Sequence, residues 1–261
     1  MASSTAGVDV EALAERLALA TSDKQPIPKL TIEEPDLDVV DAYRIQRIGI
    51  DNRVAAGETV IGYKLGLVSR AKQEAMGVAE PLWGWLTDGM CHEEEAPLDV
   101  SGLIHPRAEP ELAFLLRDDV DARTATAPTV LRATAGVFPA LEVLDSRYEK
   151  FQFTLPDVIA DNGSAARIVL GGRLVSPMDF DVQREGMVLR CDGEVVDTAA
   201  GAAIAGNPAA VVAWLARVAG GLPAGSIVLS GGLTAPVRLA PGTVVSAEYT
   251  TLGSVSLRCA S

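Results

Sequence analysis

The chain has 261 residues, 48% of them hydrophobic, with 24 glycines and 15 prolines. That is enough for one large domain, or for one domain with a small appendage, around a sizeable core. The 35 acidic residues outnumber the 22 basic ones, and the net charge of −13 argues against nucleic acid and anionic membranes as partners. An anionic substrate would need positive charge gathered at its binding site.

The three cysteines, Cys91, Cys191 and Cys259, are far apart in the sequence and form no C-x-x-C pair. They predict free thiols in a reducing compartment rather than a disulfide framework. Near the N-terminus there are acidic residues where a secretory signal would have basic ones, and no long apolar segment follows. These features predict a cytoplasmic protein.

Helices are predicted for the beginning of the chain. Apolar residues form a helical stripe over residues 8–20, and a second helix is expected over 39–56 after aspartates that can cap it. Between them, residues 22–38 contain three prolines and are expected to form an extended loop. Residues 1–58 are therefore predicted to be a small helical region ahead of a main domain, residues 59–261.

The main domain is expected to begin with a strand and a helix. The strand covers 59–65, and after Gly66 a helix covers 69–76 with Ser69 as its N-cap. The aromatic, glycine-punctuated stretch 80–90 shows no regular period. It is expected to form a pocket wall rather than a regular element.

From Leu98 onward, short strand-like segments alternate with glycine and proline turns. The clearest of these segments are 111–117, 138–144, 166–172, 187–197, 226–232 and 244–259. Asp192 and Gly193 predict a tight hairpin turn within the fourth. One helix intervenes, capped by Asn207 and ended by Gly220. The pattern as a whole predicts an α+β fold.

Three carboxylates lie in segments that are otherwise apolar. Glu109 and Glu111 share one face of a strand because side chains alternate, and Glu142 interrupts a second apolar strand. Buried carboxylates are costly unless they are paired, protonated or bound to a metal. No His or Cys lies beside them, which favours Mg²⁺ or Mn²⁺. A solvated face, or pairing of Glu142 with Arg147 or Arg107, remains the alternative interpretation.

Other polar residues also have two interpretations. Lys64, among apolar neighbours, either reaches out to solvent or directs its charge at an anionic substrate, and Arg147 allows the same two. Residues 161–164 are typical of a turn. The two glycines within 230–234 could bring backbone amides close to a ligand, although Gly-Gly after a strand is a weak signal.

Several motifs are absent or uninformative. The run from Cys91 to Glu95 is interpreted as a solvated acidic loop, because adjacent residues rarely converge on one ion. His105 could be a base, but a loop histidine is the favoured interpretation. The sequence has no G-x-S-x-G, no Walker loop and no G-x-G-x-x-G after a strand. This weakens serine hydrolase, nucleoside triphosphatase and dinucleotide-binding alternatives.

With these residues assembled, the chain resembles the fumarylacetoacetate hydrolase superfamily, in the branch of hydratases and decarboxylases of catechol meta-cleavage. The matching stretches, in order, are DAYRIQ, VIGYKLGLVSRAKQEAMGV, LIHPRAEPELAF, PALEVLDSRYEKF, ADNGSAARIVLGG, GAAIAGNPAAVVAWLA and LPAGSIVLSGGLTAPV. They cover nearly the whole chain. The resemblance implies a strand-rich mixed β-roll core behind the small helical N-terminal region, with residues 59–261 as the catalytic domain.

The resemblance also implies functional residues. A divalent ion, usually Mg²⁺ with Mn²⁺ as the alternative, is expected on Glu109, Glu111 and Glu142. Lys64 matches the lysine of the family's G-x-K-x-G-L motif and is the expected catalytic residue. Ser164 matches the serine that follows A-D-N, although the family often has Ala where this chain has Gly163.

Within the branch, hydratases carry an aspartate where this chain has Leu82. Decarboxylases are similar to this chain in having an apolar residue there, and the stretches around Arg147 and Arg167 resemble them too. The implied reaction is loss of CO₂ from the dianion of 2-oxohex-3-enedioate, which gives 2-hydroxypenta-2,4-dienoate. Leu82 and Trp83 are expected to desolvate the departing carboxylate. Arg147, Ser164 and Arg167 are expected to contact the substrate.

Three other functions stay open at this point. The first is hydration of 2-hydroxypenta-2,4-dienoate, and the second is C–C bond hydrolysis, for which only His92 and His105 could supply a histidine base. The third is a non-catalytic role beside the pathway hydratase, which predicts metal binding without turnover. The family's decarboxylases associate with that hydratase, so such a complex and a homo-oligomer are the expected assemblies.

Overall fold

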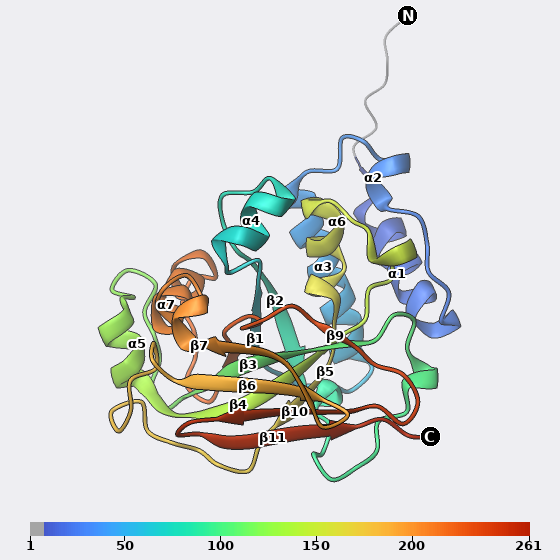
Figure 1. Cartoon of the computed structure of the whole chain (residues 1–261). Helices are drawn as coiled ribbons and strands as arrows, with labels where there is room; N and C mark the ends of the chain where they lie inside the picture. Colours follow the sequence, from blue (N-terminus) through green and yellow to red (C-terminus); the bar gives the residue numbers. More distant parts are fainter. Residues whose placement is uncertain (1–7) are drawn as a thin grey trace, which may run out of the picture.

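The computed structural model describes residues 8–261 (Figure 1). The helices are α1 (Val10–Asp23), α2 (Leu30–Glu33), α3 (Val39–Ala55), α4 (Arg70–Met76), α5 (Ala127–Ala133), α6 (Leu155–Ala160) and α7 (Pro208–Val218). The strands are β1 (Val60–Gly66), β2 (Leu82–Thr87), β3 (Arg107–Leu116), β4 (Thr134–Leu144), β5 (Ala165–Leu170), β6 (Gly186–Cys191), β7 (Glu194–Ala200), β8 (Ile227–Leu229), β9 (Val237–Arg238), β10 (Val244–Tyr249) and β11 (Gly253–Arg258). Among the described residues, no helix is both long and apolar enough to cross a membrane.

The N-terminal helices α1 and α3 lie beside α6 and share an apolar core with it (Figure 1). Both start at aspartates: Asp9 accepts a hydrogen bond from the Ala12 amide, and Asp38 accepts one from the Asp41 amide. The main side chains of this core are Leu13, Ala14, Leu17, Leu30, Ala42, Ile45, Val158 and Ile159. Both predicted helices are confirmed, with α1 running on to Asp23.

The prediction that residues 22–38 form an extended loop is wrong in part. Helix α2 lies within this stretch. Leu30 in this helix is fully buried. The next residue, Thr31, donates its amide at 3.0 Å and its hydroxyl at 2.9 Å to the Asp157 carboxylate. This single helical turn is held by a residue far away in the sequence, which the local pattern of prolines could not reveal.

The short helices α5 and α6 have no counterpart among the predicted elements. In front of α5, the Thr126 amide donates to the Thr129 hydroxyl and the Thr129 amide donates to the Thr126 hydroxyl. In front of α6, Thr154 donates both its amide and its hydroxyl to Asp157. Helices of 7 and 6 residues are too short for a helical period to show in the sequence.

The larger sheet has seven strands and runs in the order β2-β1-β8-β3-β4-β5, with β9 paired to β3. The membership of β2 corrects the prediction for residues 80–90, which form a regular strand antiparallel to β1. Leu82 and Leu86 of β2 are fully buried on one face, while Trp83 and Trp85 pack on the other. Because both faces of β2 are apolar, the alternation that marks a half-buried strand is missing from its sequence.

The ends of this sheet curl toward each other. The Asn162 side chain accepts a hydrogen bond from the Trp85 amide at 2.8 Å and donates one to its carbonyl at 3.0 Å. Cys91, just after β2, forms a bridge with Ile168 of β5. The enclosed face is filled by Leu86, Met90, Ala113, Ala140, Ala165, Ile168 and Leu229. The predicted fold class, an α+β protein with a β-roll core, is confirmed.

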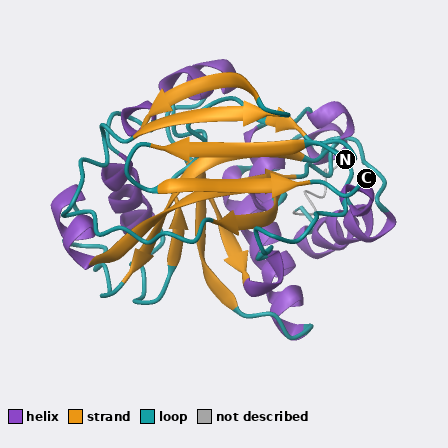
Figure 2. Cartoon of the chain, turned by 60° about the horizontal axis from the view of Figure 1, so that its bottom comes forward, coloured by secondary structure: helices purple, strands orange, loops and turns teal. Residues whose placement is uncertain are grey.

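A second sheet, in the order β11-β10-β6-β7, covers the outer face of the first (Figure 2). The predicted hairpin turn joins β6 to β7, and both Asp192 and Gly193 have the positive φ that such a turn requires. The core between the sheets includes Leu112, Phe114, Leu141, Val143, Val245, Ala247, Val255 and Leu257. Helix α7 begins at its predicted cap, Asn207, and packs with α5 at one end of the sheets (Figure 1).

Candidate metal centre

The three candidate carboxylates lie together on the enclosed face of the larger sheet. Glu109 and Glu111 alternate to the same face of β3, and Glu109 lies directly opposite Glu142 of β4. Glu111 and Glu142 are completely buried, and Glu109 is 7% exposed. These carboxylates are therefore not on a solvated face.

Two lysines lie against this group. The Lys64 ammonium, from β1, is 3.1 Å from Oε2 of Glu142 and donates a hydrogen bond to the Gly163 carbonyl at 2.9 Å. The Lys72 ammonium, from α4, is 3.0 Å from Oε1 of Glu109. Lys64 is 3% exposed, so it does not reach out to solvent. Lys64 is thus the ion-pair partner of Glu142, in place of the arginines considered from sequence.

The lysines leave part of the negative charge without a partner. Oε2 of Glu111 accepts a hydrogen bond from the Gly231 amide at 2.7 Å. Oε1 of Glu111 and both carboxylate oxygens of Glu142 have no hydrogen bond from any described residue, although Lys64 lies close by. Burial raises the pKa of Glu111 well above its ordinary value, and the charge of Glu142 adds to this effect. Burial also raises the pKa of Glu142, against the opposing effect of Lys64.

These residues fit a hard divalent cation. When all three carboxylates are ionised, as ligands of a cation must be, the two ammonium groups leave one negative charge for the cation to balance. Oxygen is the ligand atom that Mg²⁺ and Mn²⁺ prefer. Among the described residues, no three acidic, histidine or cysteine side chains already converge as a metal site. Glu109 is turned to Lys72 and Glu142 to Lys64. Glu109, Glu111 and Glu142 are the residues that would hold the ion.

The 161–164 turn positions the lysine. Asn162, Gly163 and Ser164 have φ values of 51°, 60° and 61°. Such left-handed backbone is unfavourable for residues with a side chain and needs support from its surroundings. It directs the Gly163 carbonyl at Lys64. A side chain at Gly163 would place a Cβ 3.1 Å from the Lys64 ammonium, so this position has little room for one.

Arg147 and Ser164 support this turn from inside. The Arg147 guanidinium forms an ion pair with the Asp161 carboxylate and donates a hydrogen bond to its carbonyl at 2.6 Å. The Ser164 hydroxyl donates to the same carboxylate at 3.2 Å. Burial nevertheless raises the pKa of Asp161 to about 6, against the opposing effect of Arg147. Both residues that were predicted to bind substrate thus bind Asp161 in this structure.

The other predicted contact residues are divided between two faces. Leu82 pairs with Gly66 and shares the face of Lys64, where it lies against Gly163. Trp83 alternates to the opposite face, and its ring stacks on Tyr43 with the centroids 5.2 Å apart. Of the two residues expected to desolvate the departing carboxylate, only Leu82 therefore lies on the face of Lys64.

Arg167 also faces away from the carboxylates. It pairs with Val143, one residue beyond Glu142, so its side chain alternates to the other face of the sheet. Its guanidinium donates to the Ala166 carbonyl at 2.8 Å. The structure brings together Lys64 and the three glutamates, and it leaves Arg167 outside this group.

Sequence reasoning missed several contributors. Lys72 carried no signal beyond its place on a helix close to the G-Y-K-L-G stretch, and Asp161 and Asn162 were seen only as parts of a turn. Tyr249 is completely missed: its hydroxyl donates to the Glu111 carbonyl at 2.7 Å from the second sheet. The Gly-Gly signal was informative, but the Gly231 amide binds a glutamate of the site itself.

Two weak candidates lie in loops as predicted. Within the run from Cys91 to Glu95, Cys91, Glu93 and Glu95 are exposed. His105 precedes β3, and its amide donates to the Asp145 carboxylate. Neither segment contributes a side chain to the group of three glutamates.

Comparison with known proteins places this site in a family. The family model described as fumarylacetoacetate (FAA) hydrolase C-terminal matches residues 92–259, which include all three glutamates. The chain belongs to this family. It is 41% identical over 253 residues to a 4-oxalocrotonate decarboxylase of Pseudomonas sp. (strain CF600), with 95% of this chain and 96% of that protein covered.

A second group of relatives in the family has a different activity. The chain is 39% identical over 249 residues to a 2-keto-4-pentenoate hydratase of Paraburkholderia xenovorans (strain LB400), with 94% and 93% covered. Among solved structures, 4-oxalocrotonate decarboxylase from Pseudomonas putida G7, complexed with magnesium and adipate, superposes with a TM-score of 0.93. It is 38% identical and covers 96% of this chain and 97% of its own.

Proposed function

We propose that this protein is a divalent-metal-dependent decarboxylase that converts 2-oxohex-3-enedioate (4-oxalocrotonate) to 2-hydroxypenta-2,4-dienoate and CO₂. The observation that carries the proposal is the group of three buried glutamates whose charge the two lysines do not balance. The relatives support it, because the decarboxylases match over almost the full length of both chains. The P. putida G7 enzyme was crystallised with magnesium, and adipate is a six-carbon dicarboxylate like the proposed substrate.

The substrate is a vinylogous β-keto acid, and its chemistry sets the demands on the site. When the bond from C5 to the departing carboxylate breaks, its electron pair moves through the C3–C4 double bond to the ketone oxygen at C2. Protonation of this oxygen then gives the 2-hydroxydienoate. A divalent ion held by Glu109, Glu111 and Glu142 supplies Lewis-acid chemistry for the 2-oxo acid end. The catalytic requirement on the protein is therefore to favour negative charge at the C2 oxygen.

Lys64 meets this requirement from within the protein. Its buried ammonium lies between Glu142 and the Gly163 carbonyl, which hold it in one place without a water shell. A fixed positive charge in a low-dielectric site stabilises the developing enolate more than a solvated one would. Arg147 and Ser164 are proposed to act through Asp161, by keeping the turn that orients Lys64.

Hydration is the second candidate function, because the chain is also 39% identical to a hydratase. Leu82 favours decarboxylation over hydration. Its side chain is 2% exposed and lies against Gly163 on the face of Lys64. An apolar side chain at this point cannot activate water for addition to the dienol.

The experiment uses purified full-length protein with Mg²⁺ and 2-oxohex-3-enedioate. Loss of the enone absorbance is followed together with CO₂ release, and 2-hydroxypenta-2,4-dienoate is tested separately for water addition. We expect CO₂ release that EDTA abolishes and Mg²⁺ restores, with little hydration of the dienol. Hydration without CO₂ release would establish the hydratase instead. Metal binding without either reaction would contradict both and favour the non-catalytic partner.

The cellular setting is also part of the proposal. The free cysteines Cys91, Cys191 and Cys259 fit a reducing compartment, and we infer the cytoplasm. A small anionic 2-oxo acid is the proposed substrate. Association with the pathway hydratase is expected, because the dienol product would pass directly to that enzyme. Self-association is also expected. The division into residues 1–58 and a catalytic domain of 59–261 stays a prediction.

A further inference from the structure

A small basic pocket lies at the beginning of β3. Its volume is about 220 Å³. Four of the residues around it, His105, Arg107, Lys150 and Arg238, can carry positive charge. This is unusual for a chain in which 35 acidic residues face 22 basic ones. The pocket therefore gathers the local positive charge that an anionic substrate needs.

The two arginines face each other without a counterion. Arg107 of β3 lies directly opposite Arg238 of β9, and directly opposite like charges destabilise a strand pair. Neither arginine, nor Lys150, makes an ion pair or a side-chain hydrogen bond with any described residue. Arg238 and Lys150 are exposed to solvent, and an anion bound between the three cations would relieve their mutual repulsion.

The loop after β4 is shaped to complete this pocket. Lys150 and Phe151 are consecutive residues with φ values of 57° and 58°, which is costly backbone for residues that are not glycine. The Phe151 ring lies under the Arg107 guanidinium, 4.0 Å from its carbon to the ring centroid. The ring orients this arginine without neutralising its charge. In addition, Nε2 of His105 is buried and has no hydrogen bond from the described residues.

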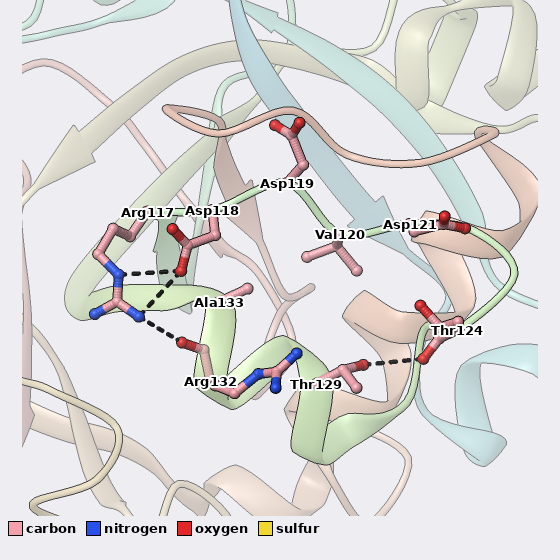
Figure 3. A pocket seen from close by; sticks show the side chains of 9 residues that line it. All are labelled: Arg117, Asp118, Asp119, Val120, Asp121, Thr124, Thr129, Arg132 and Ala133. Carbon is pink, nitrogen blue, oxygen red and sulfur yellow. Dashed lines mark hydrogen bonds and ion pairs between the residues drawn. The ribbon is translucent and has the colours of Figure 1, made fainter.

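A second pocket provides a contrast (Figure 3). It has a volume of about 460 Å³ and follows the other end of β3. Most of its charged side chains have partners: Arg117 binds Asp118 at 3.1 Å and the Arg132 carbonyl at 2.8 Å, and Asp119 accepts a hydrogen bond from the Ala224 amide at 2.7 Å. Acidic and basic groups thus line the larger pocket together, whereas no acidic residue of the described chain lines the basic pocket.

The basic pocket adjoins the metal centre through β3. Arg107 precedes Glu109 by two residues and alternates to the same face. Two residues along a strand span about 6.6 Å, a separation that a six-carbon chain can bridge. We propose that Arg107, Arg238 and Lys150 form a carboxylate subsite that takes the far carboxylate of the substrate while its 2-oxo acid end occupies the metal centre.

This subsite rests on the proposed function and adds a determinant of substrate choice to it. It places the departing carboxylate beside the arginines rather than against Leu82. Because cations that hold this carboxylate stabilise the ground state, they contribute to substrate binding and not to the rate of CO₂ loss. The subsite therefore selects dicarboxylates over monocarboxylates.

The test compares two saturated 2-oxo acids that cannot lose CO₂ by the vinylogous route, 2-oxohexanedioate and 2-oxohexanoate. They have the same length and differ only in the far carboxylate. Calorimetric titration of the Mg²⁺-loaded protein should give at least about tenfold tighter binding of the diacid. Arg238→Gln, and Arg107→Gln separately, should remove most of this preference and leave 2-oxohexanoate binding within about twofold. Arg258→Gln, an exposed arginine on β11, is the matched control and should keep the preference.

The proposal would be overturned if the arginine variants lost affinity equally for both ligands, or if their preference for the diacid were unchanged. The pocket could instead bind a separate carboxylate anion and not the far carboxylate of the substrate. To distinguish the two, acetate is titrated into protein saturated with 2-oxohexanedioate. Acetate binding that persists there and depends on Arg238 would assign the pocket to a separate anion and overturn the proposal. No binding is expected, because the far carboxylate already fills the pocket.

Steady-state kinetics of CO₂ release test the subsite separately from the proposed function. With 2-oxohex-3-enedioate, Arg238→Gln should raise KM about tenfold and leave kcat unchanged or higher. A fall in kcat with an unchanged KM would contradict a binding role. If the wild type releases no CO₂ but still prefers the diacid in the titrations, the proposed function fails and the subsite stands.

Discussion

Two buried ion clusters contact the turn at 161–164. They differ in how many of their charged atoms have hydrogen-bond partners. In one, Asp161 receives hydrogen bonds from the Arg147 guanidinium and amide and from the Ser164 hydroxyl. In the other, Glu142 lies beside Lys64 but both its oxygens lack a hydrogen bond from the described residues. Both clusters are almost completely buried.

The difference separates a structural role from a functional one. A buried ion pair whose groups are all hydrogen-bonded holds the surrounding backbone in one arrangement. A buried carboxylate without partners destabilises the fold unless a ligand compensates it, and such groups gather where a ligand binds. We therefore propose that Arg147 and Asp161 support Lys64 and that the glutamates hold the metal. Four predictions test this distinction.

The largest effect is expected for Glu111→Gln. Removing a carboxylate that holds the cation should lower the rate of CO₂ release about a thousandfold or more, because the Lewis-acid contribution is worth several kcal/mol. The stability of the metal-free protein should stay the same or rise, since the variant replaces a buried carboxyl group that lacks one hydrogen bond by a neutral amide. Enzyme assays and thermal unfolding in EDTA measure the two effects. A strongly destabilised apo variant would show that Glu111 is structural.

Arg147→Met should have the opposite profile. It leaves the Asp161 carboxylate buried without its cation, which costs about 3–5 kcal/mol of unfolding free energy. Urea denaturation measures this loss. The double variant Arg147→Met with Asp161→Asn should regain much of it, because no uncompensated charge remains. A single variant as stable as the wild type would remove Arg147 from its supporting role.

The pH dependence of stability offers a finer test of the supporting cluster. Because the pKa of Asp161 is raised to about 6, the folded state binds a proton that the unfolded state releases. The contribution of Asp161 is thus fully present below its ordinary pKa and is lost as the pH rises through 6. Relative to Asp161→Asn, the wild type should lose on the order of 2–3 kcal/mol between pH 4 and pH 7. A difference that does not change with pH would contradict the raised pKa.

The smallest effect concerns Lys72, which competes with a cation for Glu109. Its pair with Glu109 is partly exposed, with the Lys72 side chain 28% accessible, so the interaction is worth little. Lys72→Gln should therefore tighten Mg²⁺ binding severalfold, by no more than about fivefold. Titration calorimetry with Mg²⁺ measures the change, and Lys24→Gln, at the residue that follows α1, is the matched control. Weaker Mg²⁺ binding in Lys72→Gln would mean that Lys72 helps the site instead.

Only part of the site could be predicted from the sequence. Glu109, Glu111 and Glu142 stand out in the sequence because a buried carboxylate within an apolar strand must be paired, protonated or bound to a metal. Strand alternation correctly put the first two on one face. Trp83 shows the limit of that reasoning. Without a recognised strand at β2, nothing in the sequence said that Leu82 and Trp83 face opposite ways.

By itself, the sequence determined the class of the fold, the caps of α3, α4 and α7, the hairpin at Asp192 and the identity of the metal-binding candidates. These depend on neighbouring residues, whose periodicity and turn chemistry are local. Only the tertiary structure decided that Lys64 pairs with Glu142, that Arg147 supports the 161–164 turn, and that Arg107 meets Arg238. Each of these contacts joins segments that are far apart in the chain. Their partners are set by how the sheet curls, which no local pattern records.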